Sequence, residues 1–142
     1  MYIKQLSVFV ENKKGRLAEI TEILAHRGVD IRALSIADTT DYGILRLIVD
    51  DAEKAEKALK AENITVSITK VIGISVADVP GAFSQALRCL EDGDVEIEYA
   101  YAFITSRPGK AYVILRVNDR EKAIDLLKNS NAEIITQKEI FD

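Results

Sequence analysis

Two stretches of the chain decide its fold: Val8–Leu17, which reads VFVENKKGRL, and Ile74–Phe83, which reads ISVADVPGAF. Each passes from an alternating apolar segment through a loop to a glycine and a hydrophobic residue, and the two glycines stand 66 residues apart. Further along, Asp51 and Asp119 continue the correspondence at an offset of 68. A repeat at a nearly fixed offset indicates duplicated structural units. We therefore predict two domains, 1–70 and 71–142.

Within each unit the apolar residues alternate between the period of a strand and that of a helix. In the first unit we expect a strand through Leu6 and Val10, a helical stripe from Leu17 to Leu24 that ends at Gly28, and then strands and a helix at 29–37, 43–49, 51–62 and 63–70. In the second unit we expect strands and helices at 71–77, 81–91, 95–104, 110–117, 119–129 and 132–140. The order βαββαβ occurs twice. It predicts an α+β protein of two ferredoxin-like repeats, antiparallel sheets with the helices on one face.

Capping boxes mark the start of the second helix in each unit. Asp50 stands three residues before Glu53, and Asn118 stands three residues before Glu121. This spacing allows an N-cap side chain and an acidic side chain to satisfy each other's free backbone N–H groups. We predict Asp50 and Asn118 as the N-caps.

The composition narrows the class of protein. Of the 142 residues, 48% are hydrophobic and 30% are charged, and no apolar run approaches the length of a membrane span. The net charge of -4 argues against a nucleic-acid partner. Cys89 is the single cysteine and cannot form an intramolecular disulfide. We expect a cytoplasmic protein that binds neither membrane nor nucleic acid.

Candidate catalytic residues are few. His26, the single histidine, falls at the end of the first predicted helix, where it suits the negative end of the helix dipole. Cys89 lies on an amphipathic helix and is interpreted as a buried structural thiol. No nucleotide-binding or hydrolase motif occurs, and one cysteine and one histidine cannot assemble a zinc site. The sequence predicts no catalytic residues, metal or cofactor, and hence no enzyme.

An RNA-binding alternative rests on aromatic side chains. Tyr99, Tyr101 and Phe103 alternate along one predicted strand, as stacking residues do in some ferredoxin-like RNA-binding domains. The first unit has small residues there, the basic glycine-aromatic element is absent, and two glutamates precede the row. Packing in a core or an interface is the better interpretation.

Both faces of the predicted third strands are apolar. In the first unit Leu45 and Leu47 fall on one side, and Ile44 and Ile48 on the other. A sheet face open to water should be polar. We therefore expect the face away from the helices to pack against another sheet or subunit, and the protein to form a homodimer or a higher homo-oligomer.

The loop before each unit's first helix is the candidate binding element. Asn12 and Asp78 are residue types that cap helices, and Gly15 and Gly81 allow the chain to turn into a helix whose first N–H groups are free. Such a loop either binds an anion or merely caps a helix. Duplication strengthens the first interpretation.

The duplicated loop resembles that of the ACT domain, a small regulatory module of amino-acid metabolism. Asp78-Val79-Pro80-Gly81-Ala82-Phe83 is similar to the family's D/N-x-P-G-x-L/F element, and the first copy follows it except that Lys14 replaces the proline. The resemblance implies paired domains that bind a free amino acid between them. It implies these ligand-binding residues: Asn12, Lys14, Gly15, Arg16, Leu17, Asp78, Val79, Pro80, Gly81, Ala82 and Phe83.

We therefore predict a non-catalytic regulatory protein that senses a free amino acid at a domain interface, with a metabolic enzyme as the regulated partner. In that hypothesis Asn12 and Asp78 orient the amino group, and Leu17 and Phe83 support an apolar wall. The alternative is a structural or partner-binding subunit that binds no small ligand.

Overall fold

The computed structural model describes residues 1–39, 41–103 and 105–142. Its contacts divide the chain into two units, each with its own helices and core. The N-terminal unit is Lys4–Thr69, and the C-terminal unit consists of Met1–Ile3 with Lys70–Asp142. The domains predicted from the repeat, 1–70 and 71–142, remain our proposal for how the chain is organised.

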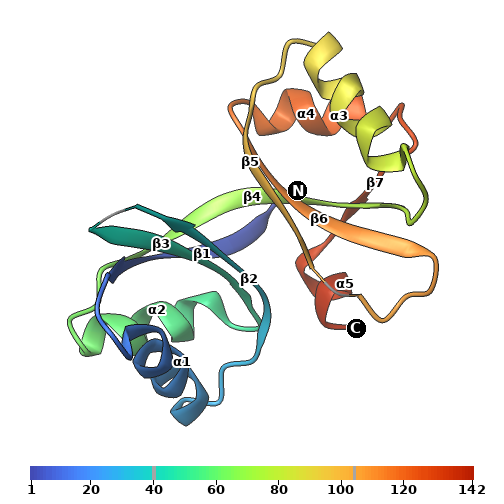
Figure 1. Cartoon of the computed structure of the whole chain (residues 1–142). Helices are drawn as coiled ribbons and strands as arrows, with labels where there is room; N and C mark the ends of the chain where they lie inside the picture. The colour runs from blue at the N-terminus through green and yellow to red at the C-terminus, as the bar shows by residue number, and fades with distance from the viewer. Residues whose placement is uncertain (40, 104) are drawn as a thin grey trace. The chain divides into compact units, whose positions relative to one another are not determined.

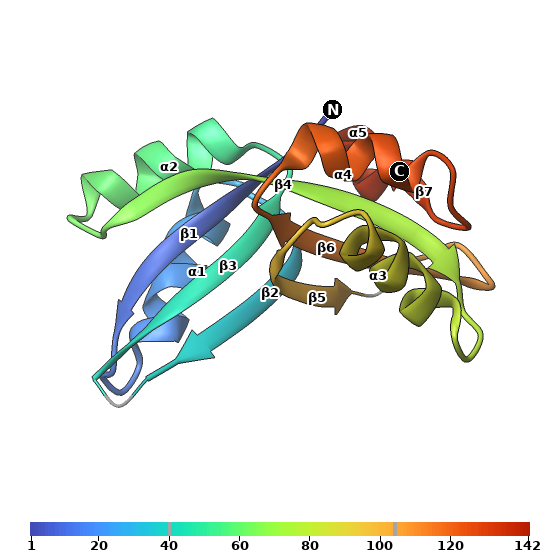
Figure 2. The same ribbon diagram turned by 90° about the horizontal axis from the view of Figure 1, so that it is seen from above.

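The N-terminal unit places two helices on one face of an antiparallel sheet (Figure 1). The strands run in the order β2-β3-β1-β4 (Figure 2), so that β2 is an edge strand. Pairing places Leu6 opposite Leu47 and Val8 opposite Leu45, on the face that the helices cover. The elements are β1 (Ile3–Glu11), α1 (Arg16–His26), β2 (Ile31–Asp38), β3 (Tyr42–Val49), α2 (Ala52–Ala61) and the first part of β4 (Val66–Ala77).

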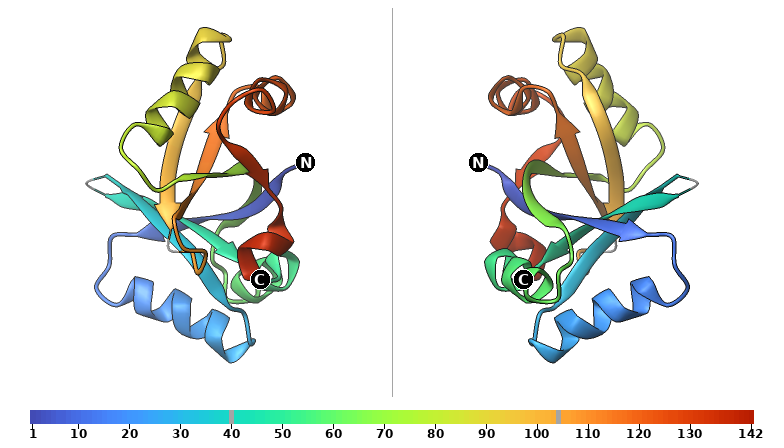
Figure 3. Two further views of the ribbon diagram at one scale, coloured as in Figure 1. Left: turned by 90° about the vertical axis from the view of Figure 1, so that its right-hand side faces the viewer. Right: turned by 90° about the vertical axis from the view of Figure 1, so that its left-hand side faces the viewer.

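The C-terminal unit repeats this plan. The remainder of β4 lies between β6 and β7, and β5 pairs with the other edge of β6. Helices α3 and α4 cover one side of these strands, and α5 lies on the other (Figure 3). The elements are α3 (Ala82–Asp92), β5 (Ile97–Phe103), β6 (Lys110–Val117), α4 (Arg120–Leu127), β7 (Glu133–Ile135) and α5 (Gln137–Phe141). The predicted α+β class with two βαββαβ repeats is confirmed.

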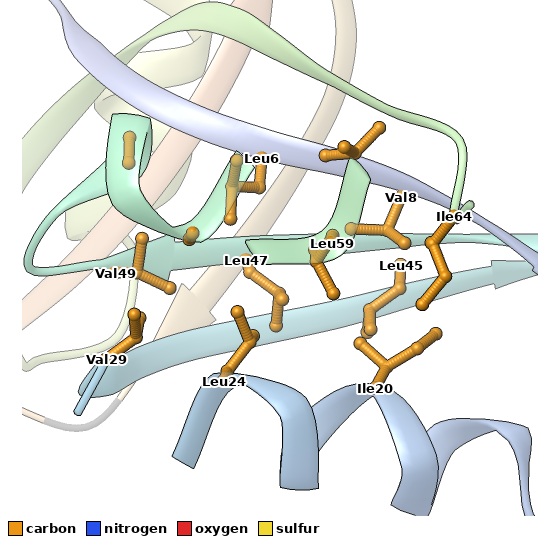
Figure 4. Packing of buried hydrophobic residues seen from close by; sticks show 13 residues of the cluster. Leu6, Val8, Ile20, Leu24, Val29, Leu45, Leu47, Val49, Leu59 and Ile64 are labelled. Carbon is orange, nitrogen blue, oxygen red and sulfur yellow. The ribbon is translucent and has the colours of Figure 1, made fainter. Parts of the chain in front are cut away.

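Side chains from α1, α2 and the sheet form the core of the N-terminal unit. Figure 4 shows Ile20 and Leu24 of α1 pointing at Leu45 and Leu47 of β3, and all four are fully buried. Burial of each such side chain contributes about 1.5–3 kcal/mol. Leu17, expected in the same stripe, is 40% exposed, so the stripe that reaches the core begins one turn later.

The prediction of a strand at 132–140 is wrong. Strand β7 has three residues, and Thr136 then caps α5 by accepting a hydrogen bond from the Glu139 backbone N–H at 3.2 Å. The Thr136 hydroxyl also donates to Glu139 Oε1 at 3.1 Å, and this N-cap starts a helix after the last strand. The strands expected at 63–70 and 71–77 are one continuous strand, β4. Ile104, in the strand predicted at 95–104, lies outside the described residues.

The predicted N-caps are each displaced by one residue. Asp51 caps α2 and Asp119 caps α4, and each side chain accepts from the backbone N–H three residues later at 3.1 Å. Asp51 and Asp119 have extended backbone, as N-caps require, with φ of -136° and -140°.

The neighbouring residues that we had predicted as caps hold the strand starts instead. Asp50 Oδ1 accepts from the Asp30 N–H at 2.9 Å, and Asn118 Oδ1 accepts from the Glu96 N–H at 3.0 Å. Each unit therefore contains an equivalent hydrogen bond of its own, which joins the residue after its third strand to the residue before its second strand. In each unit, the first of two consecutive polar residues makes this hydrogen bond and the second caps the helix.

Candidate functional site

The duplicated loops share a backbone hydrogen bond to a neighbouring hairpin. The Asn12 N–H donates to the Asp41 carbonyl at 3.3 Å, and the Asp78 N–H donates to the Gly109 carbonyl at 2.9 Å. Each bond ties a loop to the hairpin between the second and third strands of its own unit. Lys14, which replaces the family's proline, therefore leaves the loop hydrogen bond in place.

Glycines end both loops and begin both helices. Gly15 has φ of 83° and Gly81 has φ of 88°, and these residues occupy the N-cap positions of α1 and α3. Side chains other than glycine rarely adopt this left-handed conformation. Asn12 and Asp78 were predicted as N-cap types, and this role is wrong, because neither helix has a side-chain cap and both residues stand three positions earlier. Their side chains lie at the loop instead.

A cavity of about 300 Å³ opens beside the second loop. We call it the Asp78 pocket. Three of the predicted site residues line it, Asp78, Val79 and Phe83, whereas Pro80, Gly81 and Ala82 do not. Asp78 is the one charged residue among the lining residues, which are Val76, Ala77, Asp78, Val79, Phe83, Ala100, Tyr101, Ala102, Ala111 and Val113. The pocket therefore combines apolar walls with a single carboxylate.

A smaller cavity of about 190 Å³ lies at the corresponding place in the N-terminal unit. We call it the Asn12 pocket. Of the predicted site residues, Asn12, Arg16 and Leu17 line it, and Lys14 and Gly15 do not. The full set is Val10, Glu11, Asn12, Lys13, Arg16, Leu17, Ile36, Asp38 and Gly43. Six of the eleven predicted residues thus line two separate pockets of different chemistry, and the other five line neither.

Charged side chains of the Asn12 pocket pair with one another or with their neighbours. Lys13 Nζ contacts Glu11 Oε2 at 2.9 Å, and this hydrogen bond and charge lower the pKa of Glu11. Arg16 Nη1 contacts Glu19 Oε2 at 2.9 Å, while Arg16 Nε is buried without a hydrogen-bond partner. Lys13 is thus paired with a carboxylate of the pocket itself, and Arg16 is paired with Glu19, which does not line the pocket.

Sequence reasoning missed the residues that give the Asp78 pocket its space. Ala100 and Ala102 lie on the edge strand β5, opposite Leu115 and Val113. They project on the same face as the core of the unit, whereas Tyr99 and the other aromatic residues of the strand fall on the opposite face. In the sequence, two alanines at alternate positions of a strand indicate that one face of the strand leaves space for another group.

Other candidates lie away from the loops. His26 is in the last turn of α1, as expected. Cys89 was expected to be buried but is only half-buried, and its Sγ donates to the Leu126 carbonyl at 3.4 Å. A third cavity, at the C-terminal end of α3, is lined by Glu91, Asp94 and Glu96 among others. Carboxylates and a helix C-terminus both disfavour an anion there.

Among the described residues, no helix is both long enough and apolar enough to cross a bilayer.

The chain is similar to several known proteins. It is 30% identical over 73 residues to the acetolactate synthase small subunit of Haemophilus influenzae, a match that covers 49% of this chain and 45% of that protein. The match thus spans less than half the length of this relative. Protein BT0572 from Bacteroides thetaiotaomicron is 42% identical, with a TM-score of 0.90 over 100% of this chain and 97% of that one.

A more distant solved structure shares the fold. The regulatory subunit of aspartate kinase from Thermus thermophilus has a TM-score of 0.63 at 16% identity, covering 89% of this chain and 91% of that one. The family described as the ACT domain pair matches residues 1–142. With two βαββαβ units and the loop conserved in both, the chain belongs to the ACT domain pair family.

Proposed function

We propose that this protein is a non-catalytic regulatory protein that binds a free amino acid in the Asp78 pocket. The observation that carries the proposal is a cavity of about 300 Å³ beside the ACT loop of the C-terminal unit, with one carboxylate among apolar walls. Ligand pockets typically begin at about this volume. The proteins named above as small or regulatory subunits of enzymes support the regulatory role.

The pocket offers a partner for each part of an amino acid. The Asp78 carboxylate suits the ligand's ammonium, and N–H groups in the first turn of α3 suit its carboxylate, apart from that of Ala82, which donates to the Val79 carbonyl at 3.3 Å. Val76, Ala102 and Val113 suit an apolar side chain. Attraction by the helix end contributes only about 0.3–1 kcal/mol when it is exposed, whereas micromolar affinity requires about 8 kcal/mol. Most of the affinity must come from a surface that excludes water.

We propose that a neighbouring ACT unit supplies this surface through self-association, as a homodimer or a higher homo-oligomer. Val79 is 60% exposed, and Asp78, Ala100 and Ala102 are exposed as well. A second surface over these residues would exclude water from the ligand. Binding and assembly would then favour each other. A metabolic enzyme as the regulated partner, and a cytoplasmic location, remain our predictions.

Calorimetry with each of the twenty amino acids at concentrations up to a few millimolar tests the proposal. We expect at least one to bind, and we expect Gly81→Val to abolish that signal because φ of 88° disfavours a β-branched residue. Circular dichroism would check that the variant is folded. Absence of binding by all twenty would refute the proposal and favour the alternative, a structural or partner-binding subunit without a small ligand.

A further inference from the structure

The Asp78 and Asn12 pockets can be compared position by position. Each lies between the loop, the first strand, the first turn of the helix and the edge strand of its own unit. Val76 corresponds to Val10, Phe83 to Leu17 and Ala102 to Ile36, at the offset of 66 that relates the repeats. The loops have matching backbone hydrogen bonds and matching glycine conformations. Differences between the pockets therefore arise from side chains.

One difference is charge. Where the Asn12 pocket has Glu11, Lys13 and Arg16, the C-terminal unit has Ala77, Val79 and Ala82. Three of these charged groups form ion pairs within the first repeat, with Lys13 to Glu11 and Arg16 to Glu19 both at 2.9 Å, and Asp38 adds a further carboxylate to the pocket. An apolar side chain placed there would have to displace or desolvate charged groups, which costs free energy. The Asp78 pocket imposes no such cost beyond its one carboxylate.

The second difference is space. Ala100 and Ala102 correspond to Leu34 and Ile36, which project from the same face of their edge strand. The cavity volumes are about 300 Å³ with both alanines in the wall and about 190 Å³ with Ile36 in the wall. At about 30 Å³ per water molecule, the larger pocket has the volume of about ten waters and the smaller that of about six. The larger pocket therefore leaves more space for an apolar side chain.

From these differences we propose that the two repeats have diverged in function. The Asp78 pocket alone takes the ligand, an amino acid with an uncharged apolar side chain, and Ala100 and Ala102 leave the space that this side chain needs. The proposal rests on the proposed function and adds which repeat binds and which ligand class it accepts. A small alanine at position 102 leaves room for the ligand side chain against Val113, which stands opposite it in β6.

Calorimetry on the full chain tests this with five probes: L-valine, L-leucine, L-phenylalanine, L-aspartate and L-arginine. We expect at least one of valine, leucine and phenylalanine to bind at least tenfold more tightly than aspartate and arginine. Ala102→Ile, and separately Ala100→Leu, should weaken that binding at least tenfold by filling the pocket. Both alanines are exposed on an edge strand, so the larger side chains should leave the fold intact, which circular dichroism would verify.

The matched control is Ile36→Ala, which makes the reverse change at the corresponding position of the first repeat. We expect it to leave the affinity for the apolar amino acid that binds, and the number of sites, unchanged. Tighter binding of aspartate or arginine would overturn the inference while the proposed function stands, and so would wild-type affinity in both Ala102→Ile and Ala100→Leu. Loss of binding in Ile36→Ala would do the same. Absence of binding by any amino acid would overturn both.

Discussion

A side chain at position 81 would stand in open space, since no other atom lies within 4 Å of a Cβ built there, and the same is true at position 15. Only the backbone conformation requires glycine at these two positions. We therefore predict that Gly81→Ala lowers the free energy of unfolding by about 1–2 kcal/mol, the cost of a left-handed conformation for an L-residue. Urea denaturation would measure it.

Gly15→Ala provides the comparison, because its φ of 83° and its open surroundings match those of Gly81. The two losses should agree within the uncertainty of the measurement. If either substitution left the unfolding midpoint unchanged, strain at the loop glycine would not be the reason for its presence.

Asp78 is the residue whose charge our binding proposal uses. Asp78→Asn keeps the size of the side chain and removes the charge, and hydrogen bonds to charged groups contribute about 1.5–3 kcal/mol. We expect amino-acid affinity to fall by about tenfold or more in calorimetry. Since Asp78 is exposed, the free energy of unfolding should stay within about 0.5 kcal/mol of that of the wild type. An unchanged affinity would exclude Asp78 from the ligand site.

At the scale of the helix, Asp51 and Asp119 begin α2 and α4 with equivalent hydrogen bonds. We predict that Asp51→Ala costs about 1 kcal/mol of stability, because the N–H of Lys54 loses its acceptor. Asp51→Asn keeps an acceptor at the same place and should be nearly neutral. Urea denaturation of both variants would decide the point, and equal losses in the two would show that charge near the helix end matters more than the cap.

The strands show why the periodicity of a sequence locates elements better than it locates their boundaries. Asp50 and Asp51 are both acceptable caps, and only the position of the Asp30 N–H decides that Asp50 is used elsewhere. Likewise, the apolar residues Ile134 and Ile135 predicted a longer strand than the three residues that pair with β4. Long-range hydrogen bonds select among local options that a sequence leaves equal.

At the scale of the molecule, binding and assembly should be linked. A ligand at about 100 times its Kd stabilises a protein that binds it only when folded by about 2.7 kcal/mol. We predict that the amino acid that binds raises the melting temperature. It should also shift the mass measured by light scattering toward the larger assembly, because the second surface closes its pocket. A mass equal to one chain at every concentration, with and without the amino acid, would contradict self-association.

The sequence by itself determined the duplication, the βαββαβ order and the loop, because apolar periodicity and glycine spacing are local properties that each unit reproduces independently. It also located Asp78, Val79 and Phe83 beside a pocket. Tertiary structure alone decided that Ala100 and Ala102 complete that pocket, and that Arg16 and Lys13 line the Asn12 pocket. A cavity is the space left when distant strands and helices pack, and its volume depends on side chains that are remote along the chain but adjacent in the fold.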